Sequence, residues 1–166
     1  MSSGSTTNSI SIRSELLPGD LGYIAYLHGK LYAEELNYGR NFEIYVLHGL
    51  QEFAAAYDPA KDRVWICEHE DKIIGFMIGM NRGNALQLRY FIFLPEYRGL
   101  GLGKKLVTEF IAFAKERNYS SAYLWTTNEQ QGAISLYTRF GFTLTEEKES
   151  IAFDKPLVEL RYDLQL

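Results

Sequence analysis

The stretch that decides the fold is Phe91-Ile92-Phe93-Leu94-Pro95-Glu96-Tyr97-Arg98-Gly99-Leu100-Gly101-Leu102-Gly103-Lys104-Lys105. It begins as an apolar, strand-like run, breaks at Pro95, and continues as a helix whose first turn is rich in glycine. The first amides of a helix have no internal partner and the helix dipole adds positive charge there, so this end attracts phosphate. Glycine lets the backbone approach the anion closely, and Arg98 with Lys104 or Lys105 can add charge-assisted contacts. The stretch therefore predicts an anion site between a strand and a helix.

Two common phosphate-binding motifs do not match the glycine spacing. A dinucleotide fingerprint needs G-x-G-x-x-G, but the sixth position counted from either Gly99 or Gly101 is not glycine. A nucleoside-triphosphatase loop needs G-x-x-x-x-G-K-[ST], but Gly99 and Gly103 stand one residue too close, and a lysine replaces the Ser or Thr. The pattern that fits is R-x-x-G-x-G, read as Arg98, Gly101 and Gly103. Taken alone, it fits equally well a tight turn whose glycines serve packing.

Apolar periodicity divides the rest of the chain into helices and strands. Period-two alternation or short apolar runs predict strands at 10–13, 64–67, 73–80, 85–94, 122–125, 142–153 and 157–166. Helical spacing predicts helices at 21–36, 41–57, 102–118 and 129–140, with Asp20 as an N-cap and Gly141 as a C-cap. The order β-α-α-β-β-β-α-β-α-β-β, without repeat or linker, predicts one mixed α/β domain over residues 10–166.

The composition bounds the class of protein. With 166 residues, 46% of them hydrophobic and 23% charged, the chain has the size and balance of one globular domain. A net charge of −4 and a pI near 5.4 argue against a nucleic-acid binder, which usually shows a basic excess. No apolar run approaches the ~20 residues of a membrane span, and the Ser/Thr-rich segment 1–9 lacks the apolar stretch of a signal peptide. We therefore expect a disordered N-terminal segment, no nucleic-acid or membrane partner, and a cytoplasmic protein.

Cysteine and histidine give no sign of a nucleophile or a metal site. Cys67 lies in an apolar run and is interpreted as buried packing. His28, His48 and His69 lack the spacing of metal ligands, so no metal is predicted. His28 and His48 fall on predicted helices and are interpreted as surface or packing groups.

A second motif lies downstream of the glycine stretch. The strand that ends at Asn128 is followed by a helix carrying A-x-x-x-Y at Ala133 and Tyr137, and then by an aromatic-Gly-Phe turn at 140–142. Together with the R-x-x-G-x-G pattern, these residues resemble the GNAT superfamily of N-acetyltransferases, whose glycine signature binds acetyl-CoA. The two motifs cover the central half of the chain. The resemblance implies a single GNAT-like α/β domain, with a mixed, mostly antiparallel sheet splayed between its fourth and fifth strands and helices on both faces.

The resemblance also implies which residues bind acetyl-CoA, the expected cosubstrate. The splayed strand pairs its backbone with the pantetheine arm, a role that falls by position on Ile92, Phe93 and Leu94. The pyrophosphate is expected on Arg98, Gly99, Leu100, Gly101, Leu102, Gly103 and Lys104. Asn128, at the strand-helix junction, either bonds the amide arm of the cosubstrate or caps the helix.

Catalysis is assigned to Tyr137 and, against a strong alternative, to Glu35. A phenol near the thioester can protonate the departing CoA thiolate, so Tyr137 is the candidate general acid, although its helical spacing also fits plain core. An amine must lose a proton before it attacks; Glu35 is the candidate base, although a solvated helix face explains it at least as well. The expected lining of the acceptor pocket is Tyr32, Arg89 and Trp125.

The segment 28–35 resembles a branch of the family whose members occur alone or fused to MarR-type DNA-binding domains. Few residues precede the first predicted strand, so DNA binding is not expected to carry over. The resemblance implies transfer of an acetyl group to a primary amine of a small molecule or peptide, by direct attack within a ternary complex; it is compatible with a homodimer. The alternatives are a non-catalytic acyl-CoA-binding regulatory or sensor domain, and an enzyme that uses a longer acyl group. Antibiotic, polyamine, amino acid and protein N-terminus all stay open as acceptors.

Overall fold

The computed structural model describes residues 9–166 of the protein. These residues fold around a seven-stranded sheet. The elements are β1 (Ser11–Arg13), α1 (Asp20–Leu36), α2 (Arg40–Ala55), β2 (Arg63–His69), β3 (Lys72–Arg82), β4 (Ala85–Phe93), the 3₁₀ helix η2 (Pro95–Tyr97), α3 (Leu102–Glu116), β5 (Ser121–Thr127), α4 (Gln131–Arg139), β6 (Thr143–Ser150) and β7 (Leu157–Gln165). The predicted order of helices and strands is confirmed. The segment predicted to be disordered lies, apart from Ser9, outside the described residues.

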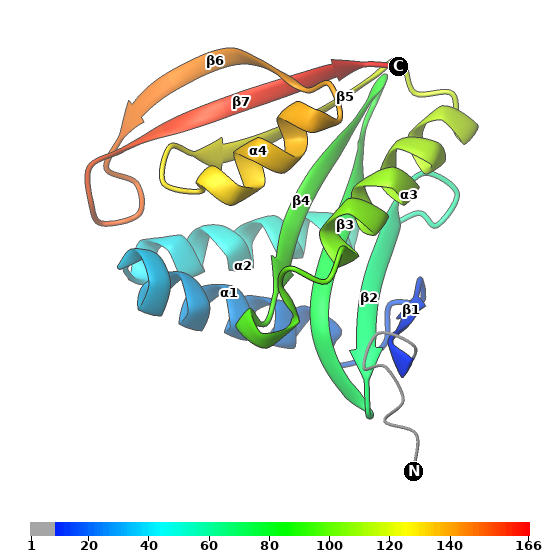
Figure 1. Ribbon diagram of the computed structural model, residues 1–166, viewed down its shortest axis with the longest axis horizontal. Coiled ribbons are helices and arrows are strands. Elements are labelled where there is room, and N and C mark those ends of the chain that lie inside the picture. Colours follow the sequence, from blue (N-terminus) through cyan, green and yellow to red (C-terminus); the bar gives the residue numbers. More distant parts are fainter. Residues whose placement is uncertain (1–8) are drawn as a thin grey trace.

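The fourth and fifth strands separate, and this gives the sheet its shape. The strand order is β1-β2-β3-β4-β5-β7-β6, and only β4 and β5 are parallel. These two strands pair from Ala85↔Ser121 to Gln87↔Tyr123 and no further. Beyond Gln87 they diverge into the V that Figure 1 shows between β4 and the β5-β7-β6 half of the sheet. The predicted splay is therefore confirmed.

A bulge in β4 sits where the splay begins. Phe76 of β3 pairs with Ile92 and Ile78 pairs with Arg89, so two residues of β4 lie opposite one residue of β3. Tyr90, one of the two, has φ 55°, a left-handed conformation that is rare for a bulky side chain. A bulge bends its strand and re-aims the side chains around it. As a result Arg89 and Tyr90 both reach the α2 side of the sheet.

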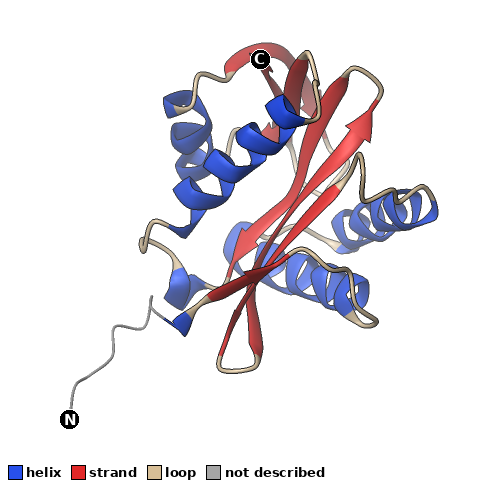
Figure 2. Cartoon of the chain, turned by 90° about the vertical axis from the view of Figure 1, so that its right-hand side faces the viewer, coloured by secondary structure: helices blue, strands red, loops and turns tan. Residues whose placement is uncertain are grey.

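Helices cover both faces of the sheet, as predicted (Figure 2). On one face α1 packs against α2 and contacts β4. On the other, α3 contacts β5 and places Phe110 and Phe113 beside Trp65 of β2. Both apolar helix faces predicted from the spacing are buried, including Ile24 of α1 and Leu106 of α3.

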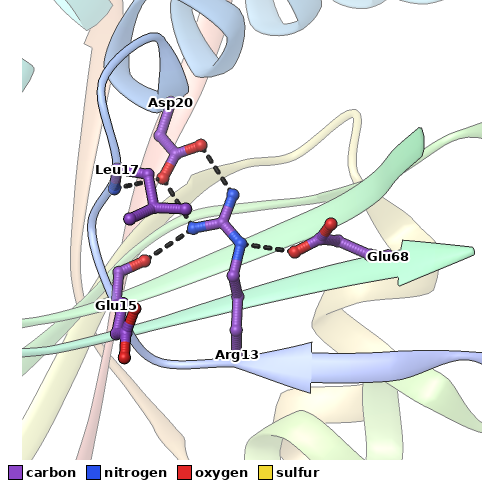
Figure 3. Close-up of polar contacts among 5 residues, drawn as sticks. All are labelled: Arg13, Glu15, Leu17, Asp20 and Glu68. Atoms are coloured by element: carbon purple, nitrogen blue, oxygen red, sulfur yellow. Dashed lines mark hydrogen bonds and ion pairs between the residues drawn. The ribbon is translucent and has the colours of Figure 1, made fainter. Parts of the chain in front are cut away.

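Asp20 does not cap α1, contrary to the prediction. The N-cap is Gly19, and Asp20 is the first helical residue. Its carboxylate instead takes two hydrogen bonds from the Arg13 guanidinium, each 2.7 Å long, and one of 2.7 Å from the amide of Leu17 (Figure 3). Arg13 also pairs with Glu68, so one guanidinium joins β1, α1 and β2. Arg13, seven residues earlier on β1, therefore binds the carboxylate that was predicted to cap the helix.

The chain between β6 and β7 closes over the first two helices. The strand predicted at 142–153 ends at Ser150, and Phe153 belongs to the loop that follows. The amide of Gly39 donates to the Phe153 carbonyl at 3.1 Å, and the Phe153 ring lies 5.0 Å from that of Phe42 and 5.3 Å from that of Tyr38. This loop therefore completes an aromatic wall at the open end of the V.

Candidate active site

A groove of about 580 Å³ runs along the glycine loop. Its walls come from the end of β4, the turn after it, the start of α3 and the start of α4. Gly101, the N-cap of α3, has φ 82°, so a residue with a Cβ would be strained there. The first turn of α3 contains no acidic residue, which leaves its free amides and dipole available to an anion.

Gly103 sits where space is tightest in this groove. A Cβ at this position would lie 3.2 Å from the Phe91 ring and 3.3 Å from Leu136, so α3 approaches both β4 and α4 closely. The sequence left a packing role and an anion-binding role open for the glycines. The structure supports packing at Gly103, whereas open space at Gly99 and Gly101 fits access for a ligand.

Arg98 connects the glycine loop to β4 and α1. Its Nε donates to the Phe93 carbonyl at 3.0 Å, and its two terminal nitrogens donate to the Glu35 carboxylate at 2.5 and 3.1 Å. Glu35 is exposed and lines this groove, not the cavity that contains Tyr137. Glu35 thus lies apart from the cavity of Tyr137, and its role as a base stays a prediction.

The predicted cosubstrate residues divide into two groups. Those that line the groove are Ile92, Phe93, Arg98, Gly99, Gly101, Leu102 and Gly103. Leu94 is buried, whereas Leu100 and Lys104 are exposed and do not line it. Asn128 faces β7: its side-chain oxygen accepts a 2.9 Å hydrogen bond from the Val158 amide. It does not cap α4 either, because the N-cap of that helix is Gln130.

A second, smaller cavity of about 100 Å³ adjoins the groove. Tyr32, Phe91 and Gln130 line both, so the two spaces meet at these residues. The hydroxyl of Tyr32 donates to the Gln130 side chain at 3.2 Å across this junction. The residues predicted separately as acceptor lining and as general acid all line the second cavity: Tyr32, Arg89, Trp125 and Tyr137. The structure therefore brings them together from α1, β4, β5 and α4.

Tyr137 is a buried residue of α4, 5% exposed, whose side chain reaches this second cavity. Its ring packs 6.3 Å from that of Phe91 and 5.9 Å from that of Phe142. Burial, with a smaller effect from Tyr32, raises the pKa of Tyr137 well above its ordinary value of 10. The core interpretation of Tyr137 is thus confirmed, and its catalytic role stays a prediction that its place in the cavity lining allows.

His28 is a packing group, one of the two interpretations left open by the sequence, but its place in the second cavity was not predicted. The side chain is 3% exposed and lines the acceptor cavity, with its ring stacked 5.7 Å from that of Tyr32. Its Nδ1 lies 2.8 Å from the Ile24 carbonyl, which can only accept, so Nδ1 carries the proton. Burial lowers the pKa of His28 to about 4, so the ring is neutral at neutral pH and Nε2 is left as an acceptor.

Glu159 was also missed, and it supplies the one carboxylate that lines this cavity among the residues described. It lies on β7, opposite Thr127 of β5 and Lys148 of β6. Its side chain is 17% exposed, and its partner Lys148 is 62% exposed at 3.8 Å. No local motif marks Glu159, because only the sheet order, with β7 beside β5, brings it to the cavity.

The remaining points concern Cys67, metal ligands and membrane spans. Cys67 is fully buried, as predicted, and burial raises the pKa of its thiol to about 12. Among residues 9–166, no group of His, Cys, Asp or Glu is arranged to hold a metal ion. In the same part of the chain, no helix has the length and apolarity to cross a membrane.

The model of the acetyltransferase (GNAT) family matches residues 29–142. This region contains the glycine loop, the splayed strands and the helix with Tyr137. The chain belongs to the GNAT family of acetyltransferases. That assignment agrees with the resemblance read from the two motifs, whereas the relation to MarR-fused members stays a prediction.

Curated relatives carry the same description. A mouse protein named as a probable N-acetyltransferase of family 8 is 29% identical over 72% of this chain and 57% of its own length. An uncharacterised N-acetyltransferase of Methanocaldococcus jannaschii is 31% identical over 55% of this chain and 42% of its own. A third, from Escherichia coli, is 31% identical over 56% of this chain and 58% of its own. The chain thus spans only about half the length of these relatives.

Solved structures share the fold along nearly the whole chain. A GNAT acetyltransferase from Elizabethkingia anophelis with acetyl-CoA bound matches with a TM-score of 0.67 at 15% identity, over 96% of this chain and 99% of that one. A spermidine N-acetyltransferase from Vibrio cholerae, in complex with CoA and spermine, matches with a TM-score of 0.70 at 18% identity, over 95% and 96%. At these identities the likeness establishes the fold alone.

Proposed function

We propose that this chain is an acetyl-CoA-dependent N-acetyltransferase that acts on a primary amine by direct attack within a ternary complex. The observation that carries the proposal is the meeting of the groove and the acceptor cavity at Tyr32, Phe91 and Gln130. One space offers glycines and the free amides of a helix to an anion, and the other holds a protonated phenol and a carboxylate. Two ligands bound in these spaces would have their reactive ends at the junction.

The groove fits acetyl-CoA by its backbone chemistry. The open space at Gly99 and Gly101 admits the pyrophosphate to the start of α3, and Arg98 lies beside it. The edge of β4 beyond Gln87 has no partner in β5, so its backbone can pair with the amide-bearing pantetheine arm. Acetyl-CoA supplies an activated thioester, which this arrangement directs toward the junction.

Tyr137 is proposed to assist the departure of CoA. When the amine nitrogen bonds to the thioester carbon, the C–S bond breaks and the sulfur leaves as a thiolate. The Tyr137 hydroxyl can donate a hydrogen bond and its proton to that sulfur. The amine loses its own proton to a separate acceptor in the cavity. Because burial keeps this phenol protonated, it is available as a donor over the whole neutral range.

Glu159 takes the place of Glu35 as the proposed proton acceptor. Its carboxylate lines the acceptor cavity and is only loosely paired with the exposed Lys148. It can attract the ammonium form of the substrate and accept its proton, directly or through water. A Glu159→Gln variant is therefore expected to lose about 10²-fold in turnover with acetyl-CoA binding retained. Unchanged turnover would remove Glu159 from the mechanism.

The proposal is tested by separating acetyl-CoA binding from turnover in Tyr137→Phe. We expect this variant to bind acetyl-CoA with unchanged affinity and to lose about 10²-fold in turnover, measured as CoA release with a panel of amines. Tyr119→Phe is the matched control, because Tyr119 is buried and lines neither space. Release of no CoA from the unmodified protein with any amine, despite tight acetyl-CoA binding, would favour the sensor alternative instead.

A further inference from the structure

Arg89 is a partly buried cation that has no anionic partner in the described part of the chain. None of the ion pairs among residues 9–166 includes it. Its guanidinium lies 4.8 Å from the ring centre of Tyr90 and 5.6 Å from that of Tyr45, and its one hydrogen bond is a 4.0 Å contact to the Met80 sulfur. Neighbouring Arg82, by contrast, is paired with Glu52 at 2.6 Å. Arginines that are shielded from solvent are usually paired with an anion. We therefore expect the guanidinium of Arg89 to bind an anionic ligand.

A second donor beside Arg89 also lacks a partner. The Tyr90 hydroxyl is buried and has no hydrogen-bond partner among the described residues, although buried polar groups nearly always have one. It lies 2.1 Å from the point where a Cβ at Gly49 would stand, and a terminal nitrogen of Arg89 lies 2.6 Å from the same point. Burial raises the pKa of Tyr90 to about 12, so the hydroxyl remains a donor. Two donors from β4 thus converge beside the one residue of α2 that leaves them room.

We propose, on the basis of the acetyl transfer proposed above, that the acceptor is a primary amine carrying a carboxylate, which Arg89 and Tyr90 bind. A planar carboxylate has two oxygens, enough to accept from the guanidinium and from the phenol together. Both side chains line the cavity of Tyr137, so the bound amine stays within that cavity. A single positive charge with one neutral donor suits a carboxylate of one negative charge better than a dianionic phosphate.

The opposite charge in the same cavity completes the recognition of an amino acid. Glu159 faces this cavity from β7, across the splay from Arg89 on β4. A zwitterion therefore finds an acceptor for its ammonium group and donors for its carboxylate on opposite walls. Charge complementarity of this kind selects the orientation that turns the nitrogen toward the thioester.

The remainder of the acceptor has space to extend outward. Arg89 also borders an outer cavity of about 310 Å³, which shares Tyr45, Gln87 and Trp125 with the inner one. In this outer space the charges of Glu52 and Arg82 neutralise each other, and His48, Gly49 and Tyr123 complete its lining. The geometry thus assigns the carboxylate to the boundary between the two cavities and the side chain of an amino acid to the outer one.

The test compares free L-amino acids with their own primary carboxamides, which keep the amine and side chain and lose only the carboxylate charge. CoA release is measured with both sets, and with spermidine as an amine lacking any anion. We expect the protein to favour the amino acid over its amide, and Arg89→Gln to lower kcat/KM about tenfold to a hundredfold for the acid only. Tyr90→Phe is expected to lower it a fewfold. Arg63→Gln is the matched control, because its guanidinium also lies over aromatic rings, those of Trp65 and Phe113, but lines neither cavity; it should leave the ratio of acid to amide unchanged.

Each result decides the proposal separately from the acetyl transfer on which it rests. Equal or faster acetylation of the amides by the unmodified protein would overturn it, and this arm needs no variant to fold. An equal loss of acid preference in Arg63→Gln and Arg89→Gln would also overturn it, since the net charge of the protein would then explain the selectivity. Acetylation of spermidine or the amides alone would leave the acetyl transfer intact, whereas CoA release with none of the amines would remove both.

Discussion

The groove of the glycine loop and the acceptor cavity are built on different principles. The groove is shaped by backbone: a left-handed glycine at the start of α3, free helix amides, and a strand edge left open by the splay. The acceptor cavity is shaped by side chains from six elements, including His28 of α1, Arg89 of β4 and Glu159 of β7. A site formed by main-chain groups depends little on the side chains around it. In a site formed by side chains, a substitution changes which ligand can bind. Under the proposed function, the first region binds the cosubstrate that the family shares and the second selects the acceptor.

The largest effect we predict is a loss of stability at acid pH that comes from His28 in the acceptor cavity. His28 titrates near pH 6.5 when unfolded but near 4 when folded, because burial disfavours its charged form. As pH falls from 6.5 to 4, the unfolded chain gains a proton that the folded protein refuses, so the free energy of unfolding drops by about 3 kcal/mol. Denaturant unfolding across this pH range should show the loss.

A His28→Asn variant sharpens this prediction, since its amide can still donate to the Ile24 carbonyl but cannot titrate. We expect a lower stability at pH 7 and a flatter dependence between pH 6.5 and 4. His48→Asn, at an exposed position of α2, is the matched control and should keep the original slope. If both variants kept it, the acid sensitivity would have to come from elsewhere in the molecule.

Backbone strain in the glycine loop should weaken acetyl-CoA binding at least tenfold. In Gly101→Val a β-branched residue must adopt φ 82°, which costs about 1–3 kcal/mol and obstructs the anion site. We expect the Kd for acetyl-CoA, measured by calorimetric titration, to rise at least tenfold. Gly22→Val, in the open interior of α1, is the control and should leave that Kd unchanged. A similar Kd for both variants would show that the start of α3 does not hold the cosubstrate.

How far the sequence predicted each region follows from the same contrast. The order of elements and the glycine loop were predicted, because apolar periods and glycine spacing are local in the chain. Glu159, His28 and Phe153 were missed as cavity residues, since sheet order and loop closure bring them there. The bulge at Tyr90 also breaks strand alternation, so the face that Arg89 uses could not be read from the sequence.

The failed helix caps have the same cause. Asp20 bonds to Arg13 of β1, and Asn128 accepts from the Val158 amide of β7. In each case a partner on a strand, seven residues away for Asp20 and 30 for Asn128, competes with the local amides that a cap would satisfy. Predictions that depend on a side chain's partner are therefore less secure than those that depend on a backbone conformation.

The ion pair between Glu35 and Arg98 gives the smallest effect and separates two roles for Glu35. If the carboxylate only competes with phosphate for Arg98, then Glu35→Gln should bind acetyl-CoA up to about fivefold more tightly with turnover retained. Glu34→Gln, one residue away and also exposed, is the control. A loss of turnover near 10²-fold in Glu35→Gln would instead restore it as the catalytic base.

The central claim is that the two regions bind two different ligands, and Gly49→Ala tests it most directly. Its new Cβ would stand 2.1 Å from the Tyr90 hydroxyl and 2.6 Å from a nitrogen of Arg89, so both donors must move while the glycine loop is untouched. Steady-state kinetics and acetyl-CoA titration of this one variant give both affinities. We predict that the KM for the amine rises about tenfold and that the Kd for acetyl-CoA stays unchanged. A comparable rise in the acetyl-CoA Kd, with the amine KM unaltered, would contradict the account.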